Sequence, residues 1–158
     1  MFGGRTMTQA GGDVQRRIVV GVDGSDSSRA ALAWAAGQAR LSGAVLDVIT
    51  AWEIPLAIRD PWPPGLTTDF GKLAKNAQAD AIADLSGRAG RVEIRPRVIE
   101  GNAADVLLDA AAGADMLVVG SHGHGGFMRA LLGSVGQHCV HHATCPVVVI
   151  REPDAAGG

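Results

Sequence analysis

The stretch from Met116 to Val135 limits the possible folds of this chain more than any other feature. It begins with the apolar run Met116–Gly120, which is typical of a strand buried on both faces of a parallel sheet. A glycine-rich loop follows, and its missing Cβ atoms let the backbone turn sharply and approach a ligand closely. Ser134 is then expected to cap a helix that runs from Val135 to about Ala143. Because the N–H groups and the positive dipole end of such a helix converge on the loop, the stretch predicts an anion site that suits phosphate.

The glycine spacing distinguishes this loop from the common phosphate-binding motifs. Two residues separate Gly120 from Gly123, nine separate Gly123 from Gly133, and Ser134 follows directly, which gives the pattern G-x2-G-x9-G-S. A Walker loop would need a lysine, and the loop has none. The dinucleotide motif would need a glycine where Met128 stands. The simple alternative is a mobile glycine loop that joins two core elements.

The composition is that of one globular domain. The chain has 158 residues, 47% of them hydrophobic, and a formal net charge of -2, which allows a sizeable core. Because no basic cluster is present, nucleic acid and anionic membrane are not expected as main partners. No apolar run is long enough for a bilayer span, and Met1–Arg5 lacks the apolar core of a signal peptide, so a cytoplasmic location is expected. We expect a disordered lead over residues 1–15, the domain over 16–152 and a flexible tail over 153–158.

Strand and helix patterns alternate along the domain. Strands are expected at Arg17–Asp23, Val45–Trp52, Val92–Ile99, Met116–Gly120 and Val147–Arg151. A first helix is expected between the capping turn Gly24–Ser27 and Gly43, and further helices at Lys72–Arg88, Ala103–Ala112 and Val135–Ala143. This order requires right-handed crossovers and predicts an α/β fold, a five-stranded parallel sheet with helices on both faces. Ligands of such sheets bind beyond the carboxyl ends of the strands. Asp23 and Gly120 follow the first and fourth strands, and they line one crevice if those strands are neighbours. Pro96 cannot donate to a ladder, which favours a sheet edge for the third strand.

Two of the expected helices carry an apolar stripe at helical spacing, which predicts the face that packs on the sheet. In the helix that Gly43 ends, the stripe is expected to comprise Ala30, Ala33, Trp34, Gly37 and Leu41. In the next helix, it is expected to comprise Leu73, Ala77, Ala81 and Leu85, while Lys75, Asn76, Asp80 and Asp84 face outward.

The cysteines and clustered histidines suggest no site of their own. Cys139 and Cys145 are expected to be two small buried residues and not a disulfide, because they are close in sequence and lie in a cytoplasmic protein. His138, His141 and His142 share a helix, but no third ligand of fixed spacing accompanies the two that share a face. Surface histidines are the simpler interpretation, and no metal site is expected.

Five short segments resemble the universal stress protein family. In chain order they are Val19–Ser25, the turn at Gly101, Gly120–Gly123, Leu131–Val135 and Cys145–Val149. Each is weak alone, but together they are specific and span residues 17 to 151. The resemblance implies a Rossmann-like fold of the adenine-nucleotide alpha-hydrolase type, with strand order 3-2-1-4-5.

What the resemblance implies about function is a regulatory or stress-response module that binds ATP, with Mg²⁺ as an optional companion of the nucleotide. The implied contacts are Gly21, Val22 and Asp23 near the adenosine, Asp23 toward the ribose, Ala51 against the base, Val119 and Gly120 along the cleft, Gly123 at the phosphates, and Gly133, Ser134, Val135 and Gly136 at their far end. His122, His124 and Arg129 could supply positive charge, and Arg129 is the better candidate because it is always protonated and forks onto phosphate. Asp23 also has a plainer interpretation, as the brace of the turn before the first helix.

Gly136 departs from the family pattern, which commonly places Ser or Thr there. Losing one hydroxyl contact weakens binding by about 1 kcal/mol, the net value of a typical hydrogen bond. ATP binding would survive, and cyclic AMP or AMP stays open as the alternative ligand.

Other functional classes also stay open. A slow ATPase is conceivable, but no Lys or Glu is placed to orient water, so weak hydrolysis at most is expected. An adenylating pyrophosphatase would need Ser-Gly-Gly-x-Asp-Ser where this chain has Asp23–Ser27. A purely structural dimer with an empty cleft is the third class. The short apolar strand Val147–Ile150 would lie at an open sheet edge, and the family commonly pairs there, so a homodimer is expected.

Overall fold

The structure is a computed structural model that describes residues 15–54, 69–85, 87, 90–122 and 132–152. Its strands are β1 (Arg17–Gly21), β2 (Val45–Trp52), β3 (Ile94–Glu100), β4 (Met116–Gly120) and β5 (Val147–Ile150), and its helices are α2 (Asp26–Ser42), α3 (Phe70–Leu85), α4 (Ala103–Ala111) and α5 (Ser134–His142). The expected tail, and the expected lead apart from Gln15, lie outside the described residues.

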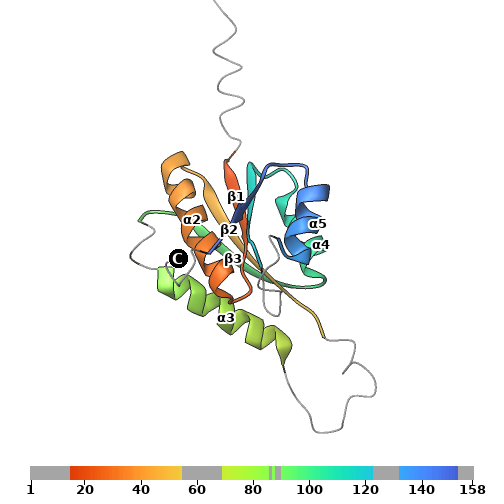
Figure 1. The fold of residues 1–158 in the computed structure, drawn as a ribbon. Coiled ribbons are helices and arrows are strands. Elements are labelled where there is room, and N and C mark those ends of the chain that lie inside the picture. The colour runs from red at the N-terminus through yellow and green to blue at the C-terminus, as the bar shows by residue number, and fades with distance from the viewer. Residues whose placement is uncertain (1–14, 55–68, 86, 88–89, 123–131, 153–158) are drawn as a thin grey trace, which may run out of the picture.

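All five strands form one parallel sheet in the order β3-β2-β1-β4-β5 (Figure 1). The α/β fold class and the strand order are therefore confirmed. α2 and α3 pack on one face of the sheet and α4 and α5 on the other, so that the sheet is the middle of three layers (Figure 1). Successive side chains of a strand point to opposite faces, and β1 shows this by sending Val20 to the α2 side and Val19 to the α4 side. Each face thus has an apolar cluster of its own.

The buried face of α2 differs from the expected one. Its buried apolar residues are Ala31, Leu32, Ala35, Ala36 and Ala39. Ala33 is exposed and Leu41 is 76% exposed, so the predicted stripe was wrong in those positions. The prediction chose among the many small residues of this helix by spacing alone, whereas in the structure a face rich in alanine packs against the sheet. Gly43, in the left-handed conformation with φ 74°, ends the helix as expected.

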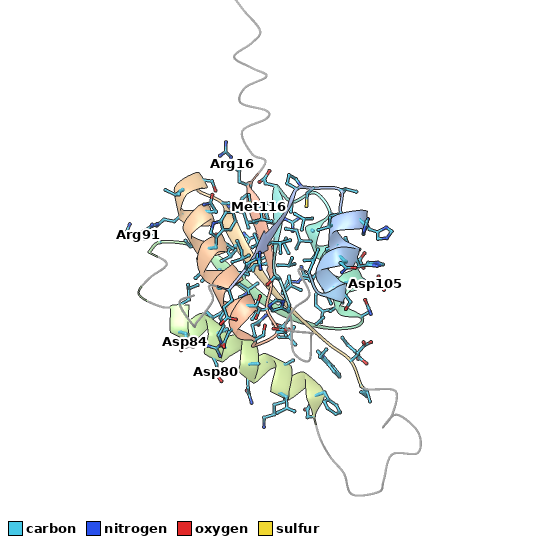
Figure 2. The ribbon with its side chains drawn as sticks, viewed as in Figure 1. Arg16, Asp80, Asp84, Arg91, Asp105 and Met116 are labelled. Carbon is cyan, nitrogen blue, oxygen red and sulfur yellow. The ribbon has the colours of Figure 1, made fainter. Side chains whose placement is uncertain are left out.

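The buried face of α3 contains a polar residue that the apolar pattern missed. Gln78 is buried, and its Nε2 atom lies 3.0 Å from Val48 O of β2 and 2.9 Å from Arg97 O of β3. This amide satisfies carbonyl groups near the sheet edge, whereas Leu73 is 56% exposed and was wrongly assigned to the core. Asp80 and Asp84 lie on the outward side of α3 as expected (Figure 2).

Pro96 lies in β3, at the edge of the sheet, as the missing N–H predicts. Leu46 N of β2 donates to Glu93 O at 2.9 Å, so the odd-numbered residues around β3 turn their peptide groups toward β2. Pro96, which is paired with Val48, is even-numbered, so its nitrogen faces away from β2 and from the sheet. Its lack of a donor therefore costs no ladder bond.

At the amino end of the sheet, Arg17 connects three elements. Its Nη1 atom donates to Asp47 Oδ2 of β2 at 3.0 Å and to Ala110 O of α4 at 2.7 Å. Its Nη2 atom donates to Ala112 O at 2.8 Å. These carbonyls belong to the last turn of α4, where the negative end of the helix dipole favours a cation. The Arg17 guanidinium therefore fastens the end of α4 to the sheet.

Candidate functional site

The candidate site lies where the carboxyl ends of β1, β2 and β4 meet. β1 lies between the other two strands, with Val20 paired to Val118 and Gly21 paired to Ile49. The ladder continues one residue past β1, where Val22 N donates to Ile49 O at 2.9 Å. The expected adjacency of the first and fourth strands is therefore confirmed. Asp23 after β1 and the residues after β4 therefore lie at the same end of the sheet, together with the amino ends of α2 and α5, and this is the place of the crevice that the sequence predicts.

Asp23 braces the turn between β1 and α2. Its Oδ1 atom accepts from Ser25 N at 2.9 Å and from Ser25 Oγ at 2.5 Å. Ser25 in turn caps α2, because its Oγ accepts from Ser28 N at 3.2 Å. Asp23 is nevertheless exposed on the crevice side of the sheet end. The Asp23 carboxylate thus has the structural role of bracing the turn, and its side chain is still accessible to solvent.

The bare Cα atoms of Gly21 and Gly120 face packed helices. A Cβ on Gly120 would lie 2.4 Å from Ser27 Oγ and 2.8 Å from the Ser27 carbonyl oxygen, in the first turn of α2. A Cβ on Gly21 would lie 2.9 Å from Leu107 Cδ1 of α4. These glycines let two helices approach the strand ends, a requirement that local sequence reasoning did not detect.

The peptide of Ser121 joins the end of β4 to β5 and α5. Its N–H donates to Ile150 O at 2.9 Å, and its carbonyl accepts from Gly133 N at 2.6 Å. Gly133 is thereby held in extended geometry, with φ -72° and ψ 171°, immediately before α5. The start of α5 is positioned by the end of the strand that borders the crevice.

Gly133, and not Ser134, is the N-cap of α5. No side chain caps this helix, and its first turn closes with Gln137 N donating to Gly133 O at 2.9 Å. The predicted cap was wrong by one residue. The hydrogen bond from Gly133 N to Ser121 O holds Gly133 in extended geometry, and the helix begins directly after it, at Ser134. Ser134, Val135 and Gly136 therefore supply the first-turn N–H groups, which have no acceptor within the helix. This is the arrangement that an anion site requires.

The space beside Gly136 is filled by Leu132. A Cβ on Gly136 would lie 2.5 Å from Leu132 Cδ1 and 3.2 Å from Leu132 Cγ. A serine or threonine at this position would therefore displace the leucine side chain. This packing is a physical reason for the glycine in this chain.

The remaining predicted contacts divide into described and undescribed residues. Ala51 and Val119 belong to the apolar side toward α4, and Val119 is only 4% exposed, so its side chain is part of the core. His122 is half-buried directly after β4. Gly123 and Arg129, the expected phosphate contacts of the loop, lie outside the described residues.

Two buried hydroxyl groups at the crevice were not among the predicted contacts. Ser27 of α2 is 3% exposed and Ser121 is 1% exposed, and their Oγ atoms lie 3.5 Å apart. Ser27 Oγ also accepts from the backbone N–H of His122 at 3.4 Å. The position of Ser121 directly after a buried strand was the available signal, but its partner is distant in sequence. The hydroxyl pair, Ser27 and Ser121, connects α2 with the end of β4.

The cysteines offer no reactive thiolate at neutral pH. Burial, and secondarily the neighbouring Cys145, raises the pKa of the Cys139 thiol to about 11. Burial also raises the pKa of the Cys145 thiol. Both are free cysteines, Cys139 buried and Cys145 half-buried, as small apolar residues would be. Within the described residues, no group of three or more His, Cys, Asp or Glu side chains could hold a metal ion.

Comparison with known sequences identifies the family. The sequence model of the universal stress protein family matches residues 15–151. The chain belongs to the universal stress protein family. It is similar to universal stress protein Rv2623 of Mycobacterium tuberculosis, with 32% identity over 143 residues that make up 87% of this chain and 48% of that protein. A universal stress protein of Thermus aquaticus is 32% identical over 139 residues, which are 86% of this chain and 98% of the relative.

This universal stress protein chain spans about half the length of the mycobacterial relatives that it matches. In the part of the chain that the structure describes, none of the helices combines the length and apolar character needed to cross a membrane.

Solved structures of universal stress proteins share the fold. A universal stress protein in complex with cAMP is similar to this chain with 31% identity and a TM-score of 0.62, covering 85% of this chain and 95% of that one. A universal stress protein from Archaeoglobus fulgidus in complex with dAMP is 26% identical with a TM-score of 0.63, covering 87% of this chain and 98% of that one. Both of these relatives therefore hold an adenine nucleotide.

Proposed function

We propose that this universal stress protein binds ATP in the crevice at the carboxyl ends of β1 and β4, and that the bound nucleotide regulates a cytoplasmic stress-response partner. The observation that carries the proposal is the start of α5 at this crevice, with Gly133 as a cap that has no side chain. The free N–H groups of the first turn suit a phosphate, and the half-charge of the helix dipole adds attraction. Asp23 and Ala51, at the ends of β1 and β2, would then meet the ribose and the base.

The alternative ligands are cyclic AMP and AMP. The relatives in complex with cAMP and dAMP favour a nucleotide with one phosphate, and the absence of a hydroxyl at Gly136 removes one contact for a third phosphate. Calorimetric titration with ATP, AMP and cyclic AMP, with and without Mg²⁺, ranks these ligands. Phosphate release measured in the same ATP samples tests the weak ATPase alternative.

Ser134→Asp is expected to weaken nucleotide binding at least tenfold without lowering thermal stability. The carboxylate would repel the phosphate, yet it suits the positive end of the α5 dipole. Ser134 is exposed, so the larger side chain can be accommodated. Ser134→Asn is the matched control, because it has similar shape and no charge. The measurements are calorimetric titration and thermal unfolding of both variants.

Equal affinity of the two Ser134 variants would contradict a phosphate site at α5. The wild-type protein should also release a nucleotide when it is denatured after purification, as mass spectrometry would detect. No released nucleotide together with no binding at millimolar ATP, AMP and cyclic AMP would leave the structural dimer as the better proposal.

We also propose that the protein forms a homodimer through β5, the edge strand beside β4. Leu117 N donates to Pro146 O and Ser121 N donates to Ile150 O, each at 2.9 Å. The peptide groups that face β4 thus belong to even-numbered residues. Val149 is odd-numbered, so its N–H and C=O groups point away from the sheet. Such an apolar edge with unpaired backbone groups favours pairing with a second copy.

Val149→Pro is expected to convert the dimer to a monomer. Proline removes the outward donor at Val149 but leaves the ladder to β4, which uses the peptide groups of the even-numbered residues. Light scattering after gel filtration measures the mass. Val149→Ala is the control, since it trims the side chain and keeps the N–H. A Val149→Pro protein with the mass of a dimer would rule out pairing through this edge.

A further inference from the structure

His122 Nδ1 is a buried polar atom with no hydrogen-bond partner among the described residues. The other ring nitrogen, Nε2, lies 3.4 Å from Ser121 Oγ. Leaving a buried donor or acceptor unpaired is costly, so buried polar atoms almost always have a partner. His122 lies just past β4, at the end of the sheet where the nucleotide is proposed to bind, so an atom of that ligand would be a fitting partner for Nδ1.

The hydroxyl pair gives the hydrogen bonds around this imidazole a direction. The backbone N–H of His122 can only donate, and it donates to Ser27 Oγ at 3.4 Å. Ser27 must place its own proton, and within the described residues the acceptor in reach is Ser121 Oγ at 3.5 Å. A Ser121 hydroxyl that accepts from Ser27 is left to donate its own proton, and His122 Nε2 lies 3.4 Å from Ser121 Oγ. Water cannot readily replace these links, because the hydroxyl pair is almost completely buried.

This direction determines the tautomer of the histidine. A neutral imidazole has one N–H and one acceptor nitrogen. If Nε2 accepts from Ser121, the proton resides on Nδ1. The unpaired buried atom of His122 is then a donor, and it suits a lone pair on a phosphate oxygen, a ribose oxygen or a base nitrogen.

We infer that the hydroxyls of Ser27 and Ser121 are positioning groups that hold His122 in its Nδ1–H tautomer, so that Nδ1–H donates to an acceptor atom of the bound nucleotide. The inference rests on the proposed nucleotide site. The three contacts measure 3.4 to 3.5 Å, longer than the usual range for hydrogen bonds of about 2.7 to 3.2 Å. Engagement of Nδ1 polarises the chain of hydrogen bonds and shortens it.

Gly120 and the peptide bonds of Ser121 support this arrangement. The bare Cα of Gly120 admits Ser27 Oγ to a point only 2.4 Å from the place that a Cβ would occupy. The backbone of Ser121 is bonded on both sides, to Ile150 O and to Gly133 N. The hydroxyl of Ser121 is therefore presented to His122 from a fixed backbone.

The first test measures the tautomer in the ligand-free protein. Long-range proton–nitrogen correlation spectra of ¹⁵N-labelled protein distinguish a protonated Nδ1 from a protonated Nε2. We expect wild-type His122 to carry its proton on Nδ1, and Ser121→Ala to shift the population toward the Nε2–H form. A wild-type Nε2–H tautomer would overturn the inference, whether or not the protein binds a nucleotide.

The second test compares two replacements of His122. The amide nitrogen of asparagine can occupy the place of Nδ1, whereas that of glutamine reaches the place of Nε2. His122→Asn is therefore expected to retain the affinity for ATP or cyclic AMP within about threefold, and His122→Gln and Ser121→Ala to lose about tenfold, close to the value of one hydrogen bond. Equal affinities of the asparagine and glutamine variants would overturn the contact. If the wild type binds no nucleotide while its Nδ1–H signal is present, the proposed function fails and the tautomer assignment stands.

Discussion

Gly120→Ala is expected to lower the free energy of unfolding by about 3 kcal/mol, the upper part of the usual range for an overpacked position, and to abolish nucleotide binding. The new Cβ would lie 2.8 Å from the carbonyl carbon and oxygen of Ser27, which are backbone atoms and cannot rotate away. The first turn of α2 would have to move, and with it the hydroxyl pair at the crevice. Urea unfolding and calorimetric titration measure the two losses.

Gly21→Ala is the matched control for this prediction. Its Cβ would meet Leu107 Cδ1 at 2.9 Å, the far end of a flexible side chain. Leu107 can change its rotamer, so we expect a loss of about 1 kcal/mol, at the lower limit for overpacking. Equal losses in the two variants would show that the backbone of α2 yields as easily as a side chain, which would contradict the prediction.

Arg17→Met is expected to lower the free energy of unfolding by about 3 kcal/mol, as for other pairs broken from one side, and to leave nucleotide affinity unchanged. The variant would leave the Asp47 side chain, only 7% exposed, without its cation. The carbonyl groups of Ala110 and Ala112 would also lose the donors that hold the end of α4. These contacts lie at the amino end of the sheet, opposite the crevice. Urea unfolding and calorimetric titration are again the measurements.

Arg16→Met is the control for the loss of an arginine. Arg16 is exposed and lies at the amino end of the sheet (Figure 2), and its Nη1 atom reaches only Ser42 O at 3.5 Å. We expect a change within about 0.5 kcal/mol, as for most surface substitutions. A loss in Arg17→Met no larger than this would contradict the role given to the buried pair with Asp47.

The fold was largely predictable because its information is local. β1, β4 and β5 are short apolar runs, and left-handed Gly43 marks a helix end as expected. The Asn102 side chain, which accepts from Asp105 N at 3.2 Å, is a local start signal of the same kind. The faces of α2 and α3 were less predictable. Which side of an alanine-rich helix is buried depends on the sheet, and the buried Gln78 amide finds its acceptors, Val48 O and Arg97 O, only in the folded sheet.

The adjacency of β1 and β4, on which the candidate site depends, was predictable, but the packing around their ends was not. Strand ends and the glycine pattern indicate the crevice, since a parallel sheet brings its carboxyl ends together. Glycine at position 120, however, is required by Ser27, which is far away in sequence. The start of α5 was displaced from Ser134 for the same kind of reason, because a bond between Gly133 and Ser121 decides where the helix begins. Contacts of this kind become visible only when the chain is folded.

The two edges of the sheet set different limits on assembly. At β3, the outward side of the strand lacks one donor because Pro96 stands there. At β5, the outward peptide groups of Val147 and Val149 keep theirs. A molecule with two adhesive edges could add copies at both ends without limit, as filaments do. If the protein pairs through β5, as proposed, Pro96 makes β3 the less favourable edge for a further copy, so that pairing need not lead to polymers.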